Sequence, residues 1–155
     1  MRIHLLSVGR RMPKWVAAGF DDYARRLPPE CALRLIEITP GRRGQDSAAQ
    51  AVALEGQRLL KSVPKGACVI ALERSGEAWS TAELARQLDG WLAGGRDLAL
   101  LIGGADGLAR DCLKRAERHW SLSPLTLPHQ LVRVILAEQL YRAWSLLQGH
   151  PYHRA

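Results

Sequence analysis

The sequence is poor in the residues that hold small or metal-dependent proteins together. Its 155 residues include three cysteines, Cys31, Cys68 and Cys112, which are far apart and form no CxxC motif. An odd number of widely spaced cysteines predicts neither a disulfide framework nor a zinc site. We therefore expect three buried thiols in a reducing compartment and no metal centre.

Long apolar runs are also missing. The first nine residues contain too short an apolar stretch for a signal peptide, and no stretch approaches the length of a membrane span. Internal repeats and low-complexity linkers are absent too. These absences, with a length that fits one domain, predict a single cytoplasmic domain over residues 1–155 that does not enter a membrane.

The charge that is present is strongly positive. The net charge is +7, and only four of the 22 basic residues are lysine. Arginine suits bidentate recognition of phosphate, so a nucleic-acid partner is expected. The first 15 residues hold Arg2, Arg10, Arg11 and Lys14 without an acid. The alternative is that a GC-rich genome encodes arginine in place of lysine.

Short aliphatic runs alternate with longer amphipathic segments, which is typical of an α/β fold with a parallel sheet. The pattern predicts strands at residues 2–8, 33–38, 67–72, 98–102 and 122–127. It predicts helices at residues 15–25, 47–62, 80–92, 106–119 and 131–147. Pro13, Pro128 and a capping box from Ser80 to Glu83 mark helix starts, and two glycines at 94–95 mark a stop.

One connection stands out by its composition. Residues 40–46 carry small residues and the pair Arg42–Arg43, and they form the only segment that we expect to be mobile. Such a loop suits a flexible basic contact with RNA. An ordinary loop between a strand and a helix is the alternative.

The predicted terminal helix, residues 131–147, is apolar around most of its circumference. Its polar residues form a single stripe that includes Glu138, Gln139 and Arg142. A helix of this kind is buried on two sides. We expect one face to pack on the sheet and another on a second subunit, which predicts a homodimer.

Glycines follow the predicted strand at residues 98–102. Gly103 and Gly104 begin a GGxxG sequence that ends at Gly107. Ligands of open α/β sheets bind at the carboxyl ends of strands, where glycine lets the backbone approach closely. The spacing matches neither a dinucleotide fingerprint nor a Walker loop. A ligand site is expected here, and a simple tight turn is the alternative.

The last six residues concentrate reactive side chains. His150, Tyr152, His153 and Arg154 supply two imidazoles, a phenol and a guanidinium. This composition indicates a tail that docks and takes part in function, whereas chain ends are usually frayed. The alternative is a solubilising end that happens to contain histidine.

Several of these segments together closely resemble the ribosomal RNA large subunit methyltransferase H family of the SPOUT superfamily. The resemblance covers essentially the whole chain, with no large insertion. The sequence departs from the family at residues 105–106, where Pro-Glu is the usual pair, and at Ala155. The matching residues are 71–76, 101–104, 122–127, His129, Arg133, 141–144 and 150–154.

The resemblance implies a function and a fold. The family methylates N3 of a pseudouridine in large-subunit rRNA, uses S-adenosylmethionine, and works as a homodimer with a trefoil-knotted C-terminal half. By this resemblance the cofactor is held mainly by backbone groups and an aliphatic wall. Its binding residues are Leu72, Gly103, Gly104, Leu122, Ser123, Pro124, Leu125, Thr126 and Leu127.

Methyl transfer to an imide nitrogen needs alignment and removal of a proton, so a base or a positive field would accelerate it. The candidates are His153, Arg154 and Arg142, with Tyr152 stacking on or orienting the base. The alternative for Arg142 is an exposed ion pair with Glu138 four residues earlier.

Three further polar residues are expected to have structural roles. His129 is assigned to the start of the terminal helix, His150 to a turn, and Asp106 to a helix N-cap.

Two other functions remain open. A basic α/β dimer could adjust ribosome assembly without catalysis, or the same fold could methylate a ribose oxygen or a tRNA base. Tight binding of S-adenosylhomocysteine would exclude the first alternative, and the identity of the methylated nucleoside would exclude the second. Whether free rRNA or the assembled ribosome is the substrate also stays open.

Overall fold

Five parallel strands form one continuous sheet in the computed structural model, which describes residues 1–153. Their order across the sheet is β2-β1-β4-β3-β5, which differs from their order along the chain. All neighbouring strands are parallel. The strands are β1 (Arg2–Val8), β2 (Ala32–Ile38), β3 (Cys68–Ala78), β4 (Leu98–Ile102) and β5 (Arg118–Ser121). The prediction of a parallel α/β fold is confirmed.

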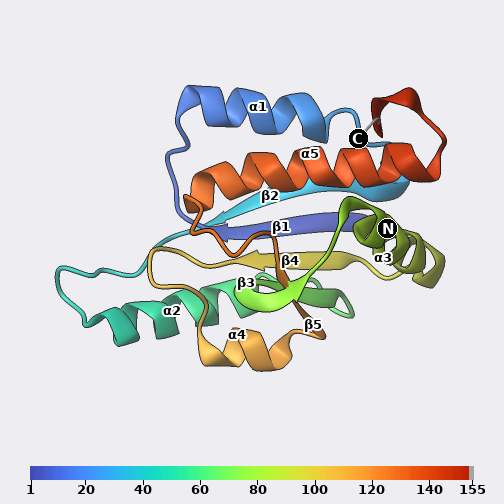
Figure 1. The fold of residues 1–155 in the computed structure, drawn as a ribbon. Coiled ribbons are helices and arrows are strands. Elements are labelled where there is room, and N and C mark those ends of the chain that lie inside the picture. Colours follow the sequence, from blue (N-terminus) through green and yellow to red (C-terminus); the bar gives the residue numbers. More distant parts are fainter. Residues whose placement is uncertain (154–155) are drawn as a thin grey trace.

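Helices cover both faces of this sheet (Figure 1). One face carries α1, α3 and α5, and the other carries α2 and α4. The helices are α1 (Lys14–Ala24), α2 (Ala48–Lys61), α3 (Thr81–Gly94), α4 (Arg110–Arg115) and α5 (His129–Leu147), with short 3-10 turns η1 (Pro29–Cys31) and η2 (Pro151–His153).

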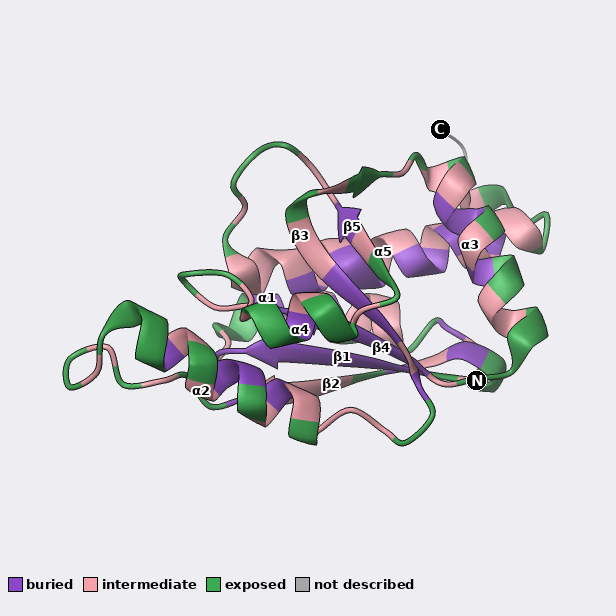
Figure 2. Ribbon diagram, turned by 90° about the horizontal axis from the view of Figure 1, so that it is seen from below, coloured by how far each residue is buried: buried purple, intermediate pink, exposed green. Residues whose placement is uncertain are grey.

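The alternation of side chains along the strands divides the core into two layers. In β1, Ile3 and Leu5 face α1, α3 and α5, whereas Leu6 and Val8 face α2 and α4. Figure 2 shows the consequence, because β1 and β4 are buried along their length while α2 and α4 are exposed on their outer sides. Central strands of a parallel sheet are apolar on both faces for this reason.

Local signals in the sequence fix most helix ends. Pro13 and Pro128 occupy the N-cap positions of α1 and α5. Ser80 and Glu83 form the predicted capping box at the start of α3. The helix ends at Gly95, whose φ of 72° is the left-handed conformation that glycine adopts without strain.

The strand predicted at residues 122–127 is wrong. The edge strand is β5, four residues earlier, and residues 122–128 form an irregular loop. Pro124 cannot donate a ladder hydrogen bond, and the hydroxyl of Ser123 accepts one from the backbone N–H of Leu125 at 3.0 Å. Side-chain bonding of this kind competes with strand pairing.

The helix predicted at residues 106–119 is also too long. Only Arg110–Arg115 is helical, and the N-cap is Ala109, so the prediction of Asp106 as N-cap is wrong. Strand β3, in contrast, is longer than the predicted strand at residues 67–72. Its polar half beyond Leu72 pairs with β5 after a register shift between Leu72 and Glu77, and the apolar pattern could not reveal this half.

Helix α5 is surrounded by other elements of its own chain, including η2. It packs on the sheet, with α1 on one side and α3 on the other, as Figure 1 shows for α1. Every residue of α5 is buried or half-buried. Intrachain packing therefore accounts for much of the apolar circumference from which a second subunit was predicted.

The burial of the cysteines and the length of the apolar helices can be compared with the predictions. Cys31 and Cys112 are buried, and burial raises the pKa of each thiol to about 11, whereas Cys68 is only half-buried. The expectation of three buried thiols is therefore wrong for Cys68. Among residues 1–153, no helix is long and apolar enough to cross a membrane.

Candidate active site

A cavity of about 560 Å³ opens at the carboxyl edge of the sheet. Three segments supply most of its lining, namely residues 72–74 in the middle of β3, the loop from β4 to α4, and the loop from β5 to α5. Its volume lies within the ~300–1,000 Å³ that is usual for small-molecule sites. The lining residues are Leu72, Glu73, Arg74, Ile102, Gly103, Gly104, Ala105, Asp106, Gly107, Leu108, Leu113, Trp120, Leu122, Ser123, Leu125, Thr126, Leu127, His129 and Val132.

This cavity collects nearly all of the residues predicted to bind a cofactor. Eight of the nine line it, and only Pro124 does not. They come from three segments that are separated by up to 55 positions, from Leu72 to Leu127. The predicted strand at 122–127 was wrong, yet the same residues reach the cavity because the loop follows β5 along the edge of the sheet.

The glycine turn, residues 103–107, forms one wall of the cavity. A Cβ atom at Gly103 would lie 2.5 Å from the carbonyl carbon of Gly107, so no other residue fits without moving backbone. The backbone N–H of Gly107 donates to the carbonyl of Gly104 at 3.1 Å, and Gly107 has a φ of 82°. The predicted tight turn and the predicted ligand edge are therefore the same structure.

The opposite wall is apolar and braced by tryptophan. Trp120 is buried and lines the cavity, and its indole stacks on Trp79 with ring centroids 5.0 Å apart. Leu125 projects from the loop and is 70% exposed. Arg74 donates to the hydroxyl of Thr126 and so joins the end of β3 to the β5–α5 loop.

His129 lies in the cavity although the sequence assigned it a structural role. It is the first residue of α5, as expected, and it also lines the cavity. Burial, and then the nearby charge of Arg133, lower the pKa of His129, which favours the neutral imidazole. The available signal was its position two residues after the predicted cofactor segment.

Arg133 fixes this end of α5 to the sheet. Its guanidinium is buried and donates to the hydroxyl of Ser7 at 3.0 Å, to the carbonyl of Gly9 at 2.9 Å and to the carboxylate of Glu37 at 2.9 Å. A buried guanidinium needs such a complete set of partners. The start of α5, and with it His129, is thereby held against β1 and β2.

The residues proposed for chemistry lie at the other end of α5. Arg142 binds Glu138 through two nitrogens, at 2.8 to 3.1 Å, and its guanidinium lies 5.0 Å from the centre of the Tyr152 ring. The hydroxyl of Tyr152 donates to the same Glu138 carboxylate at 2.9 Å. Burial and this hydrogen bond raise the pKa of Tyr152. The alternative ion pair for Arg142 is present.

His153 and His150 lie on either side of Tyr152. His153 is half-buried, and its Nδ1 atom has no hydrogen-bond partner within the described part of the chain. His150 is exposed, and its Nδ1 accepts the backbone N–H of Tyr152 at 3.1 Å, which agrees with the predicted turn. Arg154, the fourth proposed residue, lies outside the described residues.

The cavity and the tail do not meet within one chain. Helix α5 begins beside the cavity at the carboxyl edge of the sheet and ends at the amino edge, where η2 follows (Figure 1). Its 19 residues span about 28 Å at 1.5 Å per residue. The sequence left open which subunit's tail completes each site, and within one chain the structure has two separate groups of residues.

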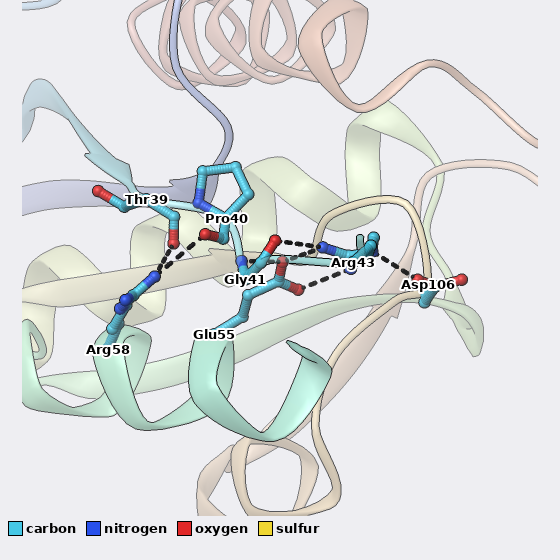
Figure 3. Close-up of polar contacts among 7 residues, drawn as sticks. All are labelled: Thr39, Pro40, Gly41, Arg43, Glu55, Arg58 and Asp106. Carbon is cyan, nitrogen blue, oxygen red and sulfur yellow. Dashed lines mark hydrogen bonds and ion pairs between the residues drawn. The ribbon is translucent and has the colours of Figure 1, made fainter. Parts of the chain in front are cut away.

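The loop between β2 and α2 is tied to the glycine turn, as Figure 3 shows. Arg43 donates to both carboxylate oxygens of Glu55, at 2.6 and 3.1 Å, and to Asp106 at 2.7 Å. Asp106 thus forms an ion pair with Arg43 and does not have the predicted N-cap role. Arg43 is consequently engaged inside the protein, and Arg42 is the exposed arginine of the predicted basic pair.

Comparison with known proteins identifies the fold and the chemistry. A family model described as predicted SPOUT methyltransferase matches residues 1–153. The chain belongs to this family. It is therefore a SPOUT methyltransferase, and its cavity lies where the family resemblance implied that the cofactor binds. Within residues 1–153 no group of three or more histidine, cysteine, aspartate or glutamate side chains could hold a metal ion.

Curated relatives of this SPOUT methyltransferase are similar along their whole length. A protein of Alkalilimnicola ehrlichii named ribosomal RNA large subunit methyltransferase H is 63% identical, with 100% of both chains covered. A protein of the same name from Thioalkalivibrio sulfidiphilus is 59% identical over 99% of both chains. Both comparisons thus extend over essentially the whole chain.

Solved structures support the fold. A probable methylase family protein from Haemophilus influenzae superposes with a TM-score of 0.54 at 15% identity, covering 99% of this chain and 70% of that one. A putative methylase family protein from Neisseria gonorrhoeae gives 0.51 at 12% identity, covering 90% and 80%. At such low identity these matches bear on the fold alone.

Proposed function

We propose that this SPOUT methyltransferase transfers a methyl group from S-adenosylmethionine to N3 of a pseudouridine in large-subunit rRNA, as a homodimer. The cavity at the carboxyl edge is the observation that carries the proposal. The names of relatives that are 63% and 59% identical support the rRNA substrate. A ribosomal substrate implies the cytoplasm as the place of action.

The cavity fits the methyl donor. Leu72, Ile102 and Leu127 offer an aliphatic surface for a purine, and the glycine turn brings backbone N–H and C=O groups to the cavity without side chains in the way. Glu73 and Asp106 add carboxylates at its border, which suits a ligand with a positive charge. The cofactor would be held by these three segments.

When bound, S-adenosylmethionine supplies an electrophilic methyl group that needs no metal for its transfer. The protein then has two tasks, alignment of the acceptor and removal of the N3 proton. The Arg133 contacts hold the start of α5, so His129 is a rigid part of the cavity wall. Its neutral imidazole adds no positive charge beside the donor.

Removal of the proton falls to the tail. Glu138 already binds Arg142 and Tyr152, so the positive charge of Arg142 is largely compensated. His153 is our first candidate for the base, and because its Nδ1 atom is buried, its other ring nitrogen, Nε2, is the one that would accept the proton. Arg154 remains the proposed source of a positive field, and Tyr152 the proposed stacking partner of the target base.

A second subunit would bring the tail and the cavity together. About 28 Å of helix separates them in one chain, and a C₂ dimer can place the tail of one chain beside the cavity of the other. Trp15 and Leu125, which are 65% and 70% exposed, are apolar residues that such a contact could cover. The trefoil knot and a single domain over the whole chain belong to this proposal too.

The carboxyl edge also suits RNA. Arg10, Arg11, Lys14 and Arg42 are exposed there, and none forms an ion pair with a carboxylate of the described residues. Arg10 donates to the hydroxyl of Thr39 at 2.9 Å, which joins the two loops that carry these cations. Unpaired cations beside a cavity attract a phosphate backbone.

One experiment separates the candidate functions. Large-subunit rRNA lacking this modification, free and in assembled ribosomes, is incubated with the protein and S-adenosylmethionine, and its nucleosides are identified by mass spectrometry. We expect N3-methylpseudouridine. A methylated ribose or a methylated tRNA base would establish another target, and absence of S-adenosylhomocysteine binding in calorimetry would favour a non-catalytic ribosome-binding factor.

A further inference from the structure

Arg43 connects a buried acid to the wall of the cavity. Glu55 extends from α2 with a side chain that is 2% exposed, while the side chain of Asp106, in the glycine turn, is 43% exposed. The Arg43 guanidinium lies between them and binds both (Figure 3). A planar guanidinium can satisfy two carboxylates at once, which a lysine cannot do with the same geometry.

The buried half of this arrangement is rigid. Glu55 also accepts the backbone N–H of Gly41 at 2.9 Å, and a Cβ atom at Gly41 would lie 2.7 Å from Ala51 in α2. A Cβ atom at Gly104 would lie 3.6 Å from the carboxylate of Glu55, so this acid sits directly behind the glycine turn. Arg43 is therefore anchored on α2 before it reaches Asp106.

We infer that Arg43 is a positioning residue for the cofactor cavity: by joining Asp106 to the buried Glu55, it holds the glycine turn in the shape that binds the methyl donor. The inference rests on the proposed function of the cavity. Within the turn itself, the bond between Gly107 and Gly104 closes the loop but does not tie it to α2. The Arg43–Asp106 ion pair provides such a tie, because Arg43 also binds Glu55 of α2.

Asp106 allows the inference to be tested without unfolding the protein. Its side chain is partly exposed, so its removal leaves no buried charge, and Arg43 keeps Glu55 as its partner. Removal of Arg43 would instead leave Glu55 buried and unpaired, which is strongly destabilising. The informative variants are Asp106→Ala and Asp106→Glu, with Asp89→Ala as a control on α3.

Calorimetry with S-adenosylhomocysteine measures the effect on binding. We expect Asp106→Ala to weaken binding about three- to tenfold, because one charge-assisted hydrogen bond to the turn is lost. Asp106→Glu keeps a carboxylate for Arg43 and should restore most of the affinity. Asp89 is exposed and does not line the cavity, so Asp89→Ala removes the same charge and should leave affinity unchanged.

Arg43→Lys provides the reciprocal test. Lysine can still neutralise Glu55 but cannot span both acids, so this variant should lose as much affinity as Asp106→Ala. Combining the two changes should add little further loss, because both break the same contact. Additive losses would show that Arg43 and Asp106 act separately and would overturn the inference.

Amide hydrogen exchange in the free protein separates this inference from the proposed function. If Arg43 positions the turn, the amides of residues 104–108 should exchange several-fold faster in Asp106→Ala than in the wild type or in Asp89→Ala. Unchanged exchange would overturn the inference even if the wild type binds S-adenosylhomocysteine. Faster exchange in a protein that does not bind this ligand would leave the positioning role intact and refute the proposed function.

Discussion

The two ends of α5 lie in chemically different surroundings. At its start, His129 and the glycine turn border an open cavity with unpaired cations nearby. At its end, Arg142 and Tyr152 share one carboxylate, Glu138, and the Tyr152 ring packs on Tyr141 with centroids 4.7 Å apart. The start of α5 is open to ligands, whereas the polar groups at its end already have partners within the protein.

This difference shows why conspicuous side chains are a poor guide to where a site lies. The tail carries the reactive groups of the sequence, yet two of its proposed residues are already bound to each other through Glu138. The cavity is built mostly from glycine and leucine, whose contribution is backbone and shape. If the two ends act together, each must be needed for a different step.

The largest expected effect concerns the tail. His153→Ala should lower methyl incorporation into rRNA by about 100-fold or more, the usual contribution of a positioned base. Affinity for S-adenosylhomocysteine should stay unchanged, because His153 does not line the cavity and is proposed to act on the target base. Single-turnover rates at saturating RNA measure the first quantity and calorimetry the second. Gln148→Ala is the control, since Gln148 is exposed directly after α5.

Mixed dimers sharpen the same comparison. His153→Ala and a cavity variant, each inactive alone, are denatured, mixed and refolded together. If each site combines the cavity of one chain with the tail of its partner, random mixing should restore about a quarter of wild-type activity, because half of the dimers hold one intact site. If each chain instead supplies a whole site, every site carries one of the two changes and no activity should return. The double variant mixed with wild type is the reference, because it should keep about a quarter of the activity for shared sites and about half for sites within one chain. A protein that stays monomeric and active would contradict the dimer.

The next effect concerns the glycine turn. Gly103→Ala should weaken cofactor binding by more than about tenfold, because strained backbone costs on the order of 1–3 kcal/mol. Its added Cβ would meet backbone at 2.5 Å. Gly90→Ala in α3 is the control, because a Cβ there meets nothing within 4 Å and alanine favours a helix. Equal affinities for the two variants would place the cofactor outside this cavity.

Much of this fold could be predicted from local patterns. The apolar runs in β1 and β4 and the capping box at Ser80 have physical causes that act within a few residues, and the structure confirms them. The error at residues 122–127 arose because Pro124 and the Ser123 hydroxyl outweigh an apolar pattern in a segment at the sheet edge. Eight of the nine predicted cofactor residues line one cavity.

Long-range contacts were beyond the sequence. Arg43 and Asp106 are 63 residues apart, and Arg133 and Ser7 are 126 apart. No periodicity links such positions, so Asp106 was assigned to the nearest helix and Arg133 received no role of its own. The separation of tail and cavity was missed for a related reason, since the length of α5 matters only once its direction across the sheet is known.

A smaller effect concerns RNA affinity at the cavity end. Replacing Arg10, Arg11 and Lys14 with alanine should reduce the slope of log affinity against log salt by about 0.7 per lost contact to single-stranded RNA, or about 2 in total. The control replaces Lys65, Arg86 and Lys114, which are exposed elsewhere on the protein. It removes the same number of positive charges. Filter binding at several salt concentrations gives both slopes. Equal changes in the two variants would mean that net charge, and not this surface, attracts the RNA.

The smallest effect is a dependence of stability on pH that is specific to the start of α5. The pKa of His129 is lowered by burial and by Arg133, so the unfolded chain binds a proton more readily than the native protein does. The contribution of His129 to the free energy of unfolding is therefore fully present above its ordinary pKa of about 6.5. It decreases as the pH falls from there toward the lower pKa that His129 has in the native protein. His129→Asn should flatten the fall in melting temperature between about pH 7.5 and 5.5. A fall in melting temperature as steep in His129→Asn as in the wild type would contradict the assignment to His129.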